Sequence, residues 1–379
     1  MLDISEGRSK LSIPQKKYVL KDITPKHPEE SVFERHLVTQ KLSRSVILDE
    51  YQRYSSNTTH RHFTNPSLGF LTSWNTNIFI YINIFYIRYD FSSLFIEKFD
   101  MLSPCWLEIK DQDNSVIISV SNTINDEWIK NIRDSCIHNI HCPLLLPRVT
   151  FNIQGIQSQD KETLLNSMTL LLNEYDFDGF VLELPLTEST ISIYTLIREL
   201  LYTINPNKQF ILISTVNPSY FAYMNHLNTL SISNSISKII DYFVLMTYDY
   251  SVRQGKIGPN APIHNVEDDI DTFLNLFEKS TKNSIQKKLL LGIAFYGYDI
   301  TEPIINNGYI DILMSQNVPF TFHKDSKEHS FKYIKNGKIH EVYYPTLYSI
   351  QERLDLCKQR NIGYSIWELG QGSRRRSGA

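Results

Sequence analysis

Short runs of apolar and β-branched residues recur along the chain, separated for the most part by stretches with helical spacing. Eight such runs occur, at residues 68–73, 99–107, 143–151, 177–184, 210–216, 242–248, 289–296 and 363–368. Most are almost continuously apolar, which is typical of strands in a parallel sheet covered on both faces. The pattern therefore predicts eight buried strands.

Between most of these runs, apolar positions recur with the period of an amphipathic helix. The clearest examples are residues 161–174, 191–203, 268–278 and 346–360. Alternating strands and helices form βα units, and eight units at this spacing predict a closed α/β barrel, the TIM (β/α)8 fold. The long gap at 299–344 contains strand-like pieces rich in Lys, His and Tyr, and predicts a small α+β insertion between strands 7 and 8.

The division of the chain follows from this pattern. Residues 1–63 are polar and weakly periodic, and we interpret them as an N-terminal extension of uncertain order. Residues 64–372 form the predicted barrel, and 373–379 are an atypical basic tail that cannot supply a last amphipathic helix. The aromatic run 77–89 interrupts the region after the first strand. It is interpreted either as a flap near the site or as a translated non-coding segment.

Composition excludes several classes of partner. The chain has 379 residues and a net charge of −3, so no basic surface argues for nucleic acid or an anionic membrane. Run 77–89 is too short to span a bilayer, and the first 20 residues lack the apolar core of a signal peptide. Aromatic residues make up 12% of the chain. Such rings suit a sugar-binding cleft, but AT-biased coding also raises their number.

The four cysteines, Cys105, Cys136, Cys142 and Cys357, are too scattered to predict a disulfide framework. Residues 136–142 also contain two histidines, so the cysteine and histidine side chains of this stretch could bind zinc. His141 and Cys142 are adjacent, however, and point apart in a regular element, which makes a shared metal ion unfavourable. No metal or cofactor is expected.

Polar and aromatic residues gather where the predicted strands end. In barrels of this type the C-terminal ends of the strands carry the site. The residues at these positions are Trp74, Asn75, Glu183, Asn217, Tyr248, Asp249, Tyr296, Trp367 and Glu368.

The fourth run resembles the DGxDxDxE signature of family 18 glycosidases. Asp178 and Gly179 match its first two positions, Val181 and Glu183 stand where two aspartates occur, and Pro185 stands where the terminal glutamate occurs. Side chains alternate along a strand, so Val181, Glu183 and Pro185 are expected to share the face that lines the barrel mouth.

Other strings support the same family resemblance. They are MTYD at 246–249, GPNAP at 258–262, GIAFYG at 292–297, SIWELGQG at 365–372 and GFLTSW at 69–74. These strings are most similar to those of the chitinase domain-containing subfamily, whose members also lack the terminal glutamate. The resemblance covers most of the chain.

The resemblance implies a non-catalytic lectin, secreted or lysosomal, that binds chitooligosaccharides and related glycans. The implied carbohydrate-binding residues are Trp367, Tyr248, Asp249, Glu183, Met246, Trp74, Tyr296 and Glu368. The implied partners are an oligosaccharide and an endocytic receptor of the stabilin type. Proline has no proton to donate, so we expect no catalysis. Glu183 is expected either to accept hydrogen bonds from sugar or to pair with an Arg or Tyr. The alternatives are a glycosidase in which Glu183, Asp249 or Glu368 is an altered acid, and an interaction protein that docks to a receptor.

Overall fold

The computed structural model describes residues 28–51, 53, 56–57, 59–72, 95–112, 115–120, 124–138, 141–153 and 158–371. The expectations for the first 20 residues, Trp74, run 77–89 and the tail 373–379 lie outside this part of the chain.

Parallel strands form the barrel, and every predicted apolar run contributes one. They are β1 (Ser67–Leu71), β2 (Met101–Pro104), β5 (Leu144–Leu145) continued by β6 (Arg148–Asn152), β7 (Gly179–Glu183), β8 (Ile211–Val216), β9 (Tyr242–Leu245), β10 (Leu289–Ala294) and β16 (Gly363–Trp367). β1 pairs with both β16 and β2, β5 pairs with β2, and β6 pairs with β7. The ring therefore closes through the interrupted strand β5–β6, and the expected TIM-barrel fold is confirmed.

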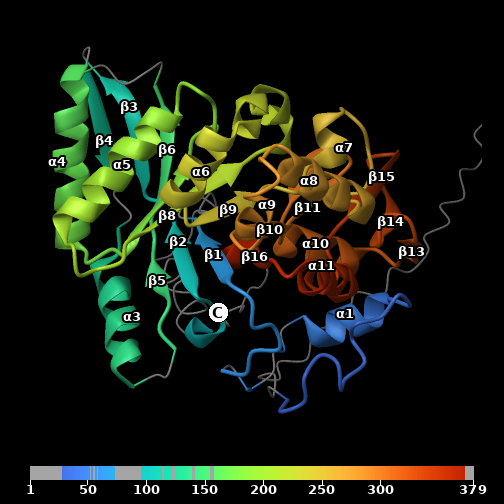
Figure 1. Cartoon of the computed structure of the whole chain (residues 1–379). Helices are drawn as coiled ribbons and strands as arrows, with labels where there is room; N and C mark the ends of the chain where they lie inside the picture. The colour runs from blue at the N-terminus through green and yellow to red at the C-terminus, as the bar shows by residue number, and fades with distance from the viewer. Residues whose placement is uncertain are drawn as a thin grey trace, which may run out of the picture.

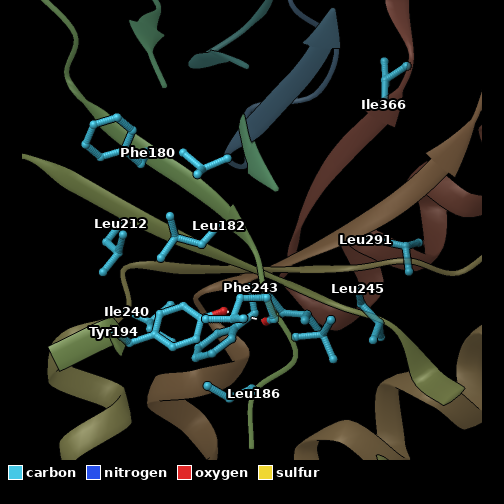
Figure 2. Close-up of a cluster of buried hydrophobic side chains, with 14 of the residues drawn as sticks. Phe180, Leu182, Leu186, Tyr194, Leu212, Ile240, Phe243, Leu245, Leu291 and Ile366 are labelled. Atoms are coloured by element: carbon cyan, nitrogen blue, oxygen red, sulfur yellow. Dashed lines mark hydrogen bonds between the residues drawn. The ribbon is translucent and has the colours of Figure 1, made fainter. Parts of the chain in front are cut away.

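Strand side chains divide between the inside and the outside of the barrel with a period of two. Leu68, Phe70, Val181, Ile211, Ile213, Val244 and Leu290 form one buried cluster, which fills the interior. The intervening residues belong to a second cluster, between the sheet and the helices, and Figure 2 shows Phe180, Leu182, Leu212 and Phe243 there. In the same cluster the hydroxyl of Tyr194 bonds to the Leu184 carbonyl at 2.8 Å.

Helices cover the outer face of the barrel, as Figure 1 shows. They are α3 (Asp126–His138), α4 (Ser158–Glu174), α5 (Ile191–Ile204), α6 (Leu230–Ile239), α8 (Ile263–Asn275) and α11 (Leu347–Arg360), with the short helices α7 (Tyr250–Arg253) and α9 (Lys282–Gln286). Helix α8 begins five residues before the predicted start at 268, directly after Pro262. A proline at the start costs the helix no hydrogen bond.

One hairpin extends the sheet beyond the expected strands. β3 (Leu107–Gln112) pairs in parallel with β6, and β4 (Ser115–Val120) pairs with β3 in the antiparallel direction. Helix α4 packs against β4. The hairpin therefore extends the sheet beside β6.

The expected insertion between the last two barrel strands is an antiparallel sheet with one helix. It consists of β11 (Gly297–Asp299), β12 (Glu302–Ile304), α10 (Asn306–Ser315), β13 (Phe320–His323), β14 (Glu328–Lys335) and β15 (Lys338–Tyr343). It lies at the right of Figure 1. A helix that the sequence pattern did not indicate, α1 (Arg44–Glu50), packs on α10 through Leu48.

The sequence predicted no disulfide framework, and the described residues contain one disulfide. It joins Cys136 and Cys142, between the end of α3 and the start of β5, and was not predicted. Cys105 and Cys357 are buried thiols. Within the described residues no group of His, Cys, Asp and Glu side chains could hold a metal ion. In the same part of the chain, none of the helices has the length and apolar character needed to cross a bilayer.

Candidate active site

The first two residues of the fourth-strand signature have structural roles. Asp178 is buried and accepts hydrogen bonds from the Leu145 backbone and from Arg133, both at 2.8 Å. Gly179 has a φ of +140°, and a Cβ there would lie 1.8 Å from the carbonyl oxygen of Ile211. Only glycine fits this conformation and this close approach of two strands. This pair thus fixes the base of β7 and, with it, the residues that follow.

Glu183 ends β7 and points into the mouth of the barrel. Val181, two residues earlier, lies in the interior cluster, so the alternation of the strand directs Glu183 the same way. Arg148 of β6 donates to Glu183 Oε2 from Nε at 2.5 Å and also from Nη2. The sequence left two roles open for Glu183, and the structure shows one of them, pairing with an arginine. Its side chain is still 34% exposed, so it also remains accessible to a ligand.

Arg148 joins Glu183 to the tryptophan at the end of β16. Its guanidinium carbon lies 5.1 Å from the centroid of the Trp367 ring, a distance at which a cation is attracted to an aromatic face. Burial would lower the pKa of Arg148, but the neighbouring Cys105 and Glu183 raise it. Burial also raises the pKa of the Cys105 thiol to about 12, so it is not a nucleophile at neutral pH. Trp367 is half-buried, and its ring packs 5.1 Å from Phe70.

Asp249 follows β9 and carries two tyrosine hydrogen bonds. The hydroxyls of Tyr296 and Tyr298 both donate to its Oδ1, Tyr298 at 2.6 Å. Burial and the nearby carboxylate raise the pKa of both tyrosines, so they stay neutral donors. Asp249 has a φ of +68°, which places it in the left-handed region. The site therefore holds this carboxylate in an uncommon backbone conformation.

The loop that matched the GPNAP string holds Asp249 in place. The Asp249 backbone N–H donates to Asn260 Oδ1 at 2.8 Å, and Asn260 Nδ2 donates to the Tyr296 carbonyl at 3.0 Å. The backbone N–H groups of Asn260 and Ala261 donate to Glu328 of the insertion at 2.9 and 2.8 Å. Arg353 of α11 pairs with Glu328 at 2.9 Å, and both side chains are only 5% exposed.

The remaining predicted site residues have different surroundings. Tyr248 is buried with its ring 6.1 Å from that of Tyr296, and burial, Asp249 and Glu183 raise its pKa. Met246 is half-buried against the core. Glu368 is fully buried and accepts from the Gly370 backbone at 2.9 Å, so it cannot reach a ligand as it stands. The peptide bond between Trp367 and Glu368 is cis.

Pro185 lies beyond the strand, in the loop that follows β7, and it is exposed. Its carbonyl accepts a hydrogen bond from the Thr190 hydroxyl at 2.5 Å. Strand β7 ends at Glu183, so Pro185 does not continue the inward-facing row of Val181 and Glu183 as a strand residue.

The sequence analysis missed two residues that build the site, Arg148 and Tyr298, and included Asn260 only as part of the GPNAP string. One signal was available for Arg148, because it is the only charged residue in the apolar run 143–151. A lone charge in a buried strand requires a partner. Tyr298 carried no comparable signal.

The sequence matches the model of the family described as Glycosyl hydrolases family 18 over residues 148–372. Curated relatives include the cortical fragment-lytic enzyme of Bacillus subtilis, 29% identical over 145 residues, and that of Bacillus anthracis, 26% identical. Each alignment covers 35% of this chain and 32% of the relative. The chain thus matches about one third of the length of these relatives.

Solved structures share the fold. The spore cortex-lytic enzyme SleL of Bacillus megaterium superimposes with a TM-score of 0.60 at 17% identity, over 84% of this chain and 73% of that one. SleL of Bacillus cereus gives 0.59 at 15% identity, over 91% and 82%. A Cycas revoluta chitinase mutant in complex with (GlcNAc)4 gives 0.56 at 15% identity, over 81% and 95%.

The expectation that this protein is not an enzyme is therefore wrong. The matched family is one of glycosyl hydrolases, and the relatives are named as lytic enzymes. The expectation rested on one position, Pro185, whereas the family match extends over the whole C-terminal part of the barrel.

Proposed function

Because the chain belongs to glycosyl hydrolase family 18, we propose that it cleaves glycosidic bonds in a glycan that contains N-acetylglucosamine. The observation that carries the proposal is the pair of carboxylates Glu183 and Asp249, which follow β7 and β9 on the same rim of one barrel. Trp367 lies near Glu183, because Arg148 contacts both side chains. The names of the relatives support the substrate class, since they act on spore cortex or chitin.

Trp367 provides the platform for the sugar. Its ring is half-buried, and its flat apolar face suits the C–H face of a pyranose. Tyr248 and Asp249 follow β9 on the same rim and supply polar groups for an acetamide. Asp249 is suited to this role because Tyr296, Tyr298 and Asn260 fix its orientation before a ligand arrives. Preorganised polar groups stabilise a transition state without reorganising during the reaction.

Family 18 enzymes use the acetamide of the substrate as the nucleophile. Its carbonyl oxygen attacks the anomeric carbon, the glycosidic bond breaks, and the leaving oxygen takes a proton from a carboxylic acid. Water then opens the cyclic intermediate and returns a proton to the same carboxylate. Both steps need one carboxyl group that alternates between acid and base.

We assign this role to Glu183. Glu368 is fully buried, and Oδ1 of Asp249 is engaged by two tyrosines, whereas Glu183 is 34% exposed at the rim. Both Arg148 contacts go to Oε2, so Oε1 of Glu183 is the oxygen that we assign to face the leaving oxygen of the substrate. The position of Pro185 in the next loop then has no part in proton transfer.

A fluorogenic chitobioside assay tests the proposal. Glu183→Gln keeps the shape of the side chain but removes the acid, so turnover should fall by about 10² to 10⁴-fold, the usual contribution of general acid catalysis. Isothermal titration with a tetramer of N-acetylglucosamine provides the control. Glu183→Gln should bind it as the wild type does, and Trp367→Ala should bind it more weakly. Undiminished turnover in Glu183→Gln would contradict the assignment.

The compartment is part of the proposal. The Cys136–Cys142 disulfide supports a secreted or lysosomal location, because disulfides persist in oxidising compartments and are rare in the reducing cytosol. The closer resemblance to the chitinase domain-containing subfamily and the stabilin-type receptor stay predictions.

A further inference from the structure

A depression lies on the same rim of the barrel as the candidate active site. It has a volume of about 660 Å³ and is lined by Thr187, Glu188, Ser189, Ala222, Tyr223 and Asn225. The first three residues follow β7 and the last three follow β8. Because β7 and β8 are paired in parallel, the loops at their C-terminal ends meet at one edge of the barrel. Glu183 lies only four residues before Thr187.

Exposed tyrosines distinguish this depression from the surrounding surface. The side chain of Tyr223 is 69% exposed and that of Tyr220 is 42% exposed, with ring centroids 6.4 Å apart. A tyrosine ring offers an apolar face and a polar hydroxyl, which suits a ligand with both kinds of surface. The exposed carboxylate of Glu188 and the side-chain amide of Asn225 add groups that bind hydroxyls and acetamides.

The backbone that presents these groups is held on both sides. Asn217 caps the 3-10 helix η2 (Pro218–Tyr223) by accepting from the Ser219 N–H at 3.0 Å. Met224 and Leu227 anchor the turn because they are buried in the core. On the other side, the Thr187 N–H donates to the Thr190 hydroxyl at 2.9 Å, which orders the loop after β7. A preorganised surface loses less entropy when it binds a ligand.

We infer that this depression binds outer sugar units of the polymer whose scissile bond lies at Glu183. The inference rests on the proposed function for the path of the polymer, and it extends that site by a further subsite. The ring of Tyr223 stacks on a sugar face, while Glu188 and Asn225 hydrogen-bond its hydroxyl or acetamide groups. A short oligosaccharide that binds only beside Trp367 does not reach Tyr223.

Isothermal titration with oligomers of two lengths tests the inference. Titrations use the Glu183→Gln protein, so that the ligand is not cleaved. Adding Tyr223→Ala should weaken the Kd for a hexamer of N-acetylglucosamine about tenfold, the size expected for loss of an aromatic contact residue. The Kd for a dimer should not change, because it does not span both places.

Tyr202→Ala is the matched control. Tyr202 is 63% exposed, but it lies near the end of α5, at the opposite end of the barrel, where Arg198 stacks on its ring at 5.5 Å. This variant should bind both oligomers like the parent protein. If Tyr223→Ala leaves the hexamer Kd unchanged, or weakens dimer and hexamer equally, the subsite does not exist.

The outcomes also separate this inference from the proposed reaction. Loss of hexamer affinity in Tyr223→Ala, together with a wild-type protein that cleaves no hexamer, would overturn the hydrolysis and keep the subsite. If Tyr223→Ala, made in the active protein, cleaves the hexamer as the wild type does, the proposed hydrolysis stands and the subsite is overturned.

Discussion

Arg148 contacts two residues of the site that lie on different strands, Glu183 at the end of β7 and Trp367 at the end of β16. It is a buried cation that contacts Glu183 with its Nε and Nη2 atoms and the Trp367 ring with its planar face. A guanidinium can make a forked ion pair and stack at the same time, whereas the compact ammonium of lysine cannot. We therefore assign Arg148 as a positioning residue for the acid and the sugar platform.

Replacing Arg148 should separate these effects. Arg148→Met keeps much of the volume but removes the charge, so kcat should fall and KM should rise, together lowering kcat/KM by about 10² because small misplacements of catalytic groups are costly. Arg148→Lys should recover part of kcat, since it restores the charge without the fork. Steady-state kinetics with the chitobioside measure both constants.

Arg360→Met is the control for the loss of a paired arginine. Arg360 pairs with Asp271 at 2.9 Å on the surface, with side-chain exposures of 34% and 52%. This variant should keep both kinetic constants. If Arg148→Met also keeps them, Arg148 only stabilises the fold.

At the level of single residues, the sequence predicted where a side chain points better than which residue it contacts. The strand alternation placed Glu183 in the barrel mouth, because a period of two needs no knowledge of the rest of the fold. Its partner Arg148 lies 35 residues away in the sequence, on another strand. Only the closed sheet brings the two together. The expectation of no catalysis rested on Pro185 at the position of the terminal glutamate, and Glu183 entered only as an altered acid in an alternative hypothesis.

At the level of elements, helix α11 and strand β14 share a buried histidine. His329 of β14 is 1% exposed, with Nδ1 3.1 Å from the Thr346 hydroxyl and Nε2 3.0 Å from the Gln40 carbonyl. Thr346 is the N-cap of α11 and forms a capping box with Ser349. A carbonyl can only accept, so Nε2 carries a proton, whereas the Thr346 hydroxyl can donate to Nδ1 or accept from it. Burial disfavours the charged form of the ring.

This arrangement predicts a loss of stability in mild acid. Burial lowers the pKa of His329 in the folded state below its ordinary value of 6.5. As the pH falls through 6.5, the unfolded chain takes up a proton that the folded chain does not, so the free energy of unfolding decreases. The contribution of His329 to the free energy of unfolding should therefore be smaller at pH 5.5 than at pH 7.5. Urea unfolding at the two pH values measures it.

His329→Gln should flatten this pH dependence, because glutamine does not titrate. His264→Gln serves as the comparison, since His264 is exposed at the surface of α8. It should leave the pH dependence as it is in the wild type. A wild-type slope retained in His329→Gln would show that other groups cause the acid loss.

Elements with strong periodicity were predicted well, and short or context-dependent ones were not. Helix α11 agrees with its prediction to one residue, because its apolar pattern and its Thr346 cap lie in the local sequence. The predicted run 99–107 includes the first residue of β3, and the sequence did not predict the hairpin β3–β4 as a separate element. Helix α1 was missed because it has a single buried residue, Leu48, and depends on its packing against α10.

At the level of the whole molecule, the count of apolar runs sufficed to predict the barrel. Eight strands with helices between them leave few other arrangements that bury both faces of a parallel sheet. The insertion was also predictable from the length of the gap before the last strand. Its attachment was not, because the Glu328 contacts to Asn260 and Ala261 join residues 68 and 67 positions apart.

The disulfide is a feature of the whole molecule that can be tested directly. Replacing both Cys136 and Cys142 by serine should lower the free energy of unfolding by about 2 kcal/mol, as expected for a short closed loop. Denaturant unfolding with and without a reducing agent measures the change. Reduction should destabilise the wild type to the same degree and leave the double variant unaffected. Equal stability of the wild type in both conditions would contradict the prediction.

The tie between the insertion and the barrel rim has a mechanical consequence. Glu328 belongs to the insertion, yet through Asn260 it fixes the backbone of Asp249. The insertion and the backbone of Asp249 are thus connected through hydrogen bonds. Transplanting the insertion of a relative onto this barrel would therefore disturb the Asp249 carboxylate. In this chain, selection for a new ligand and selection for turnover are coupled, and the two properties cannot evolve as independent modules.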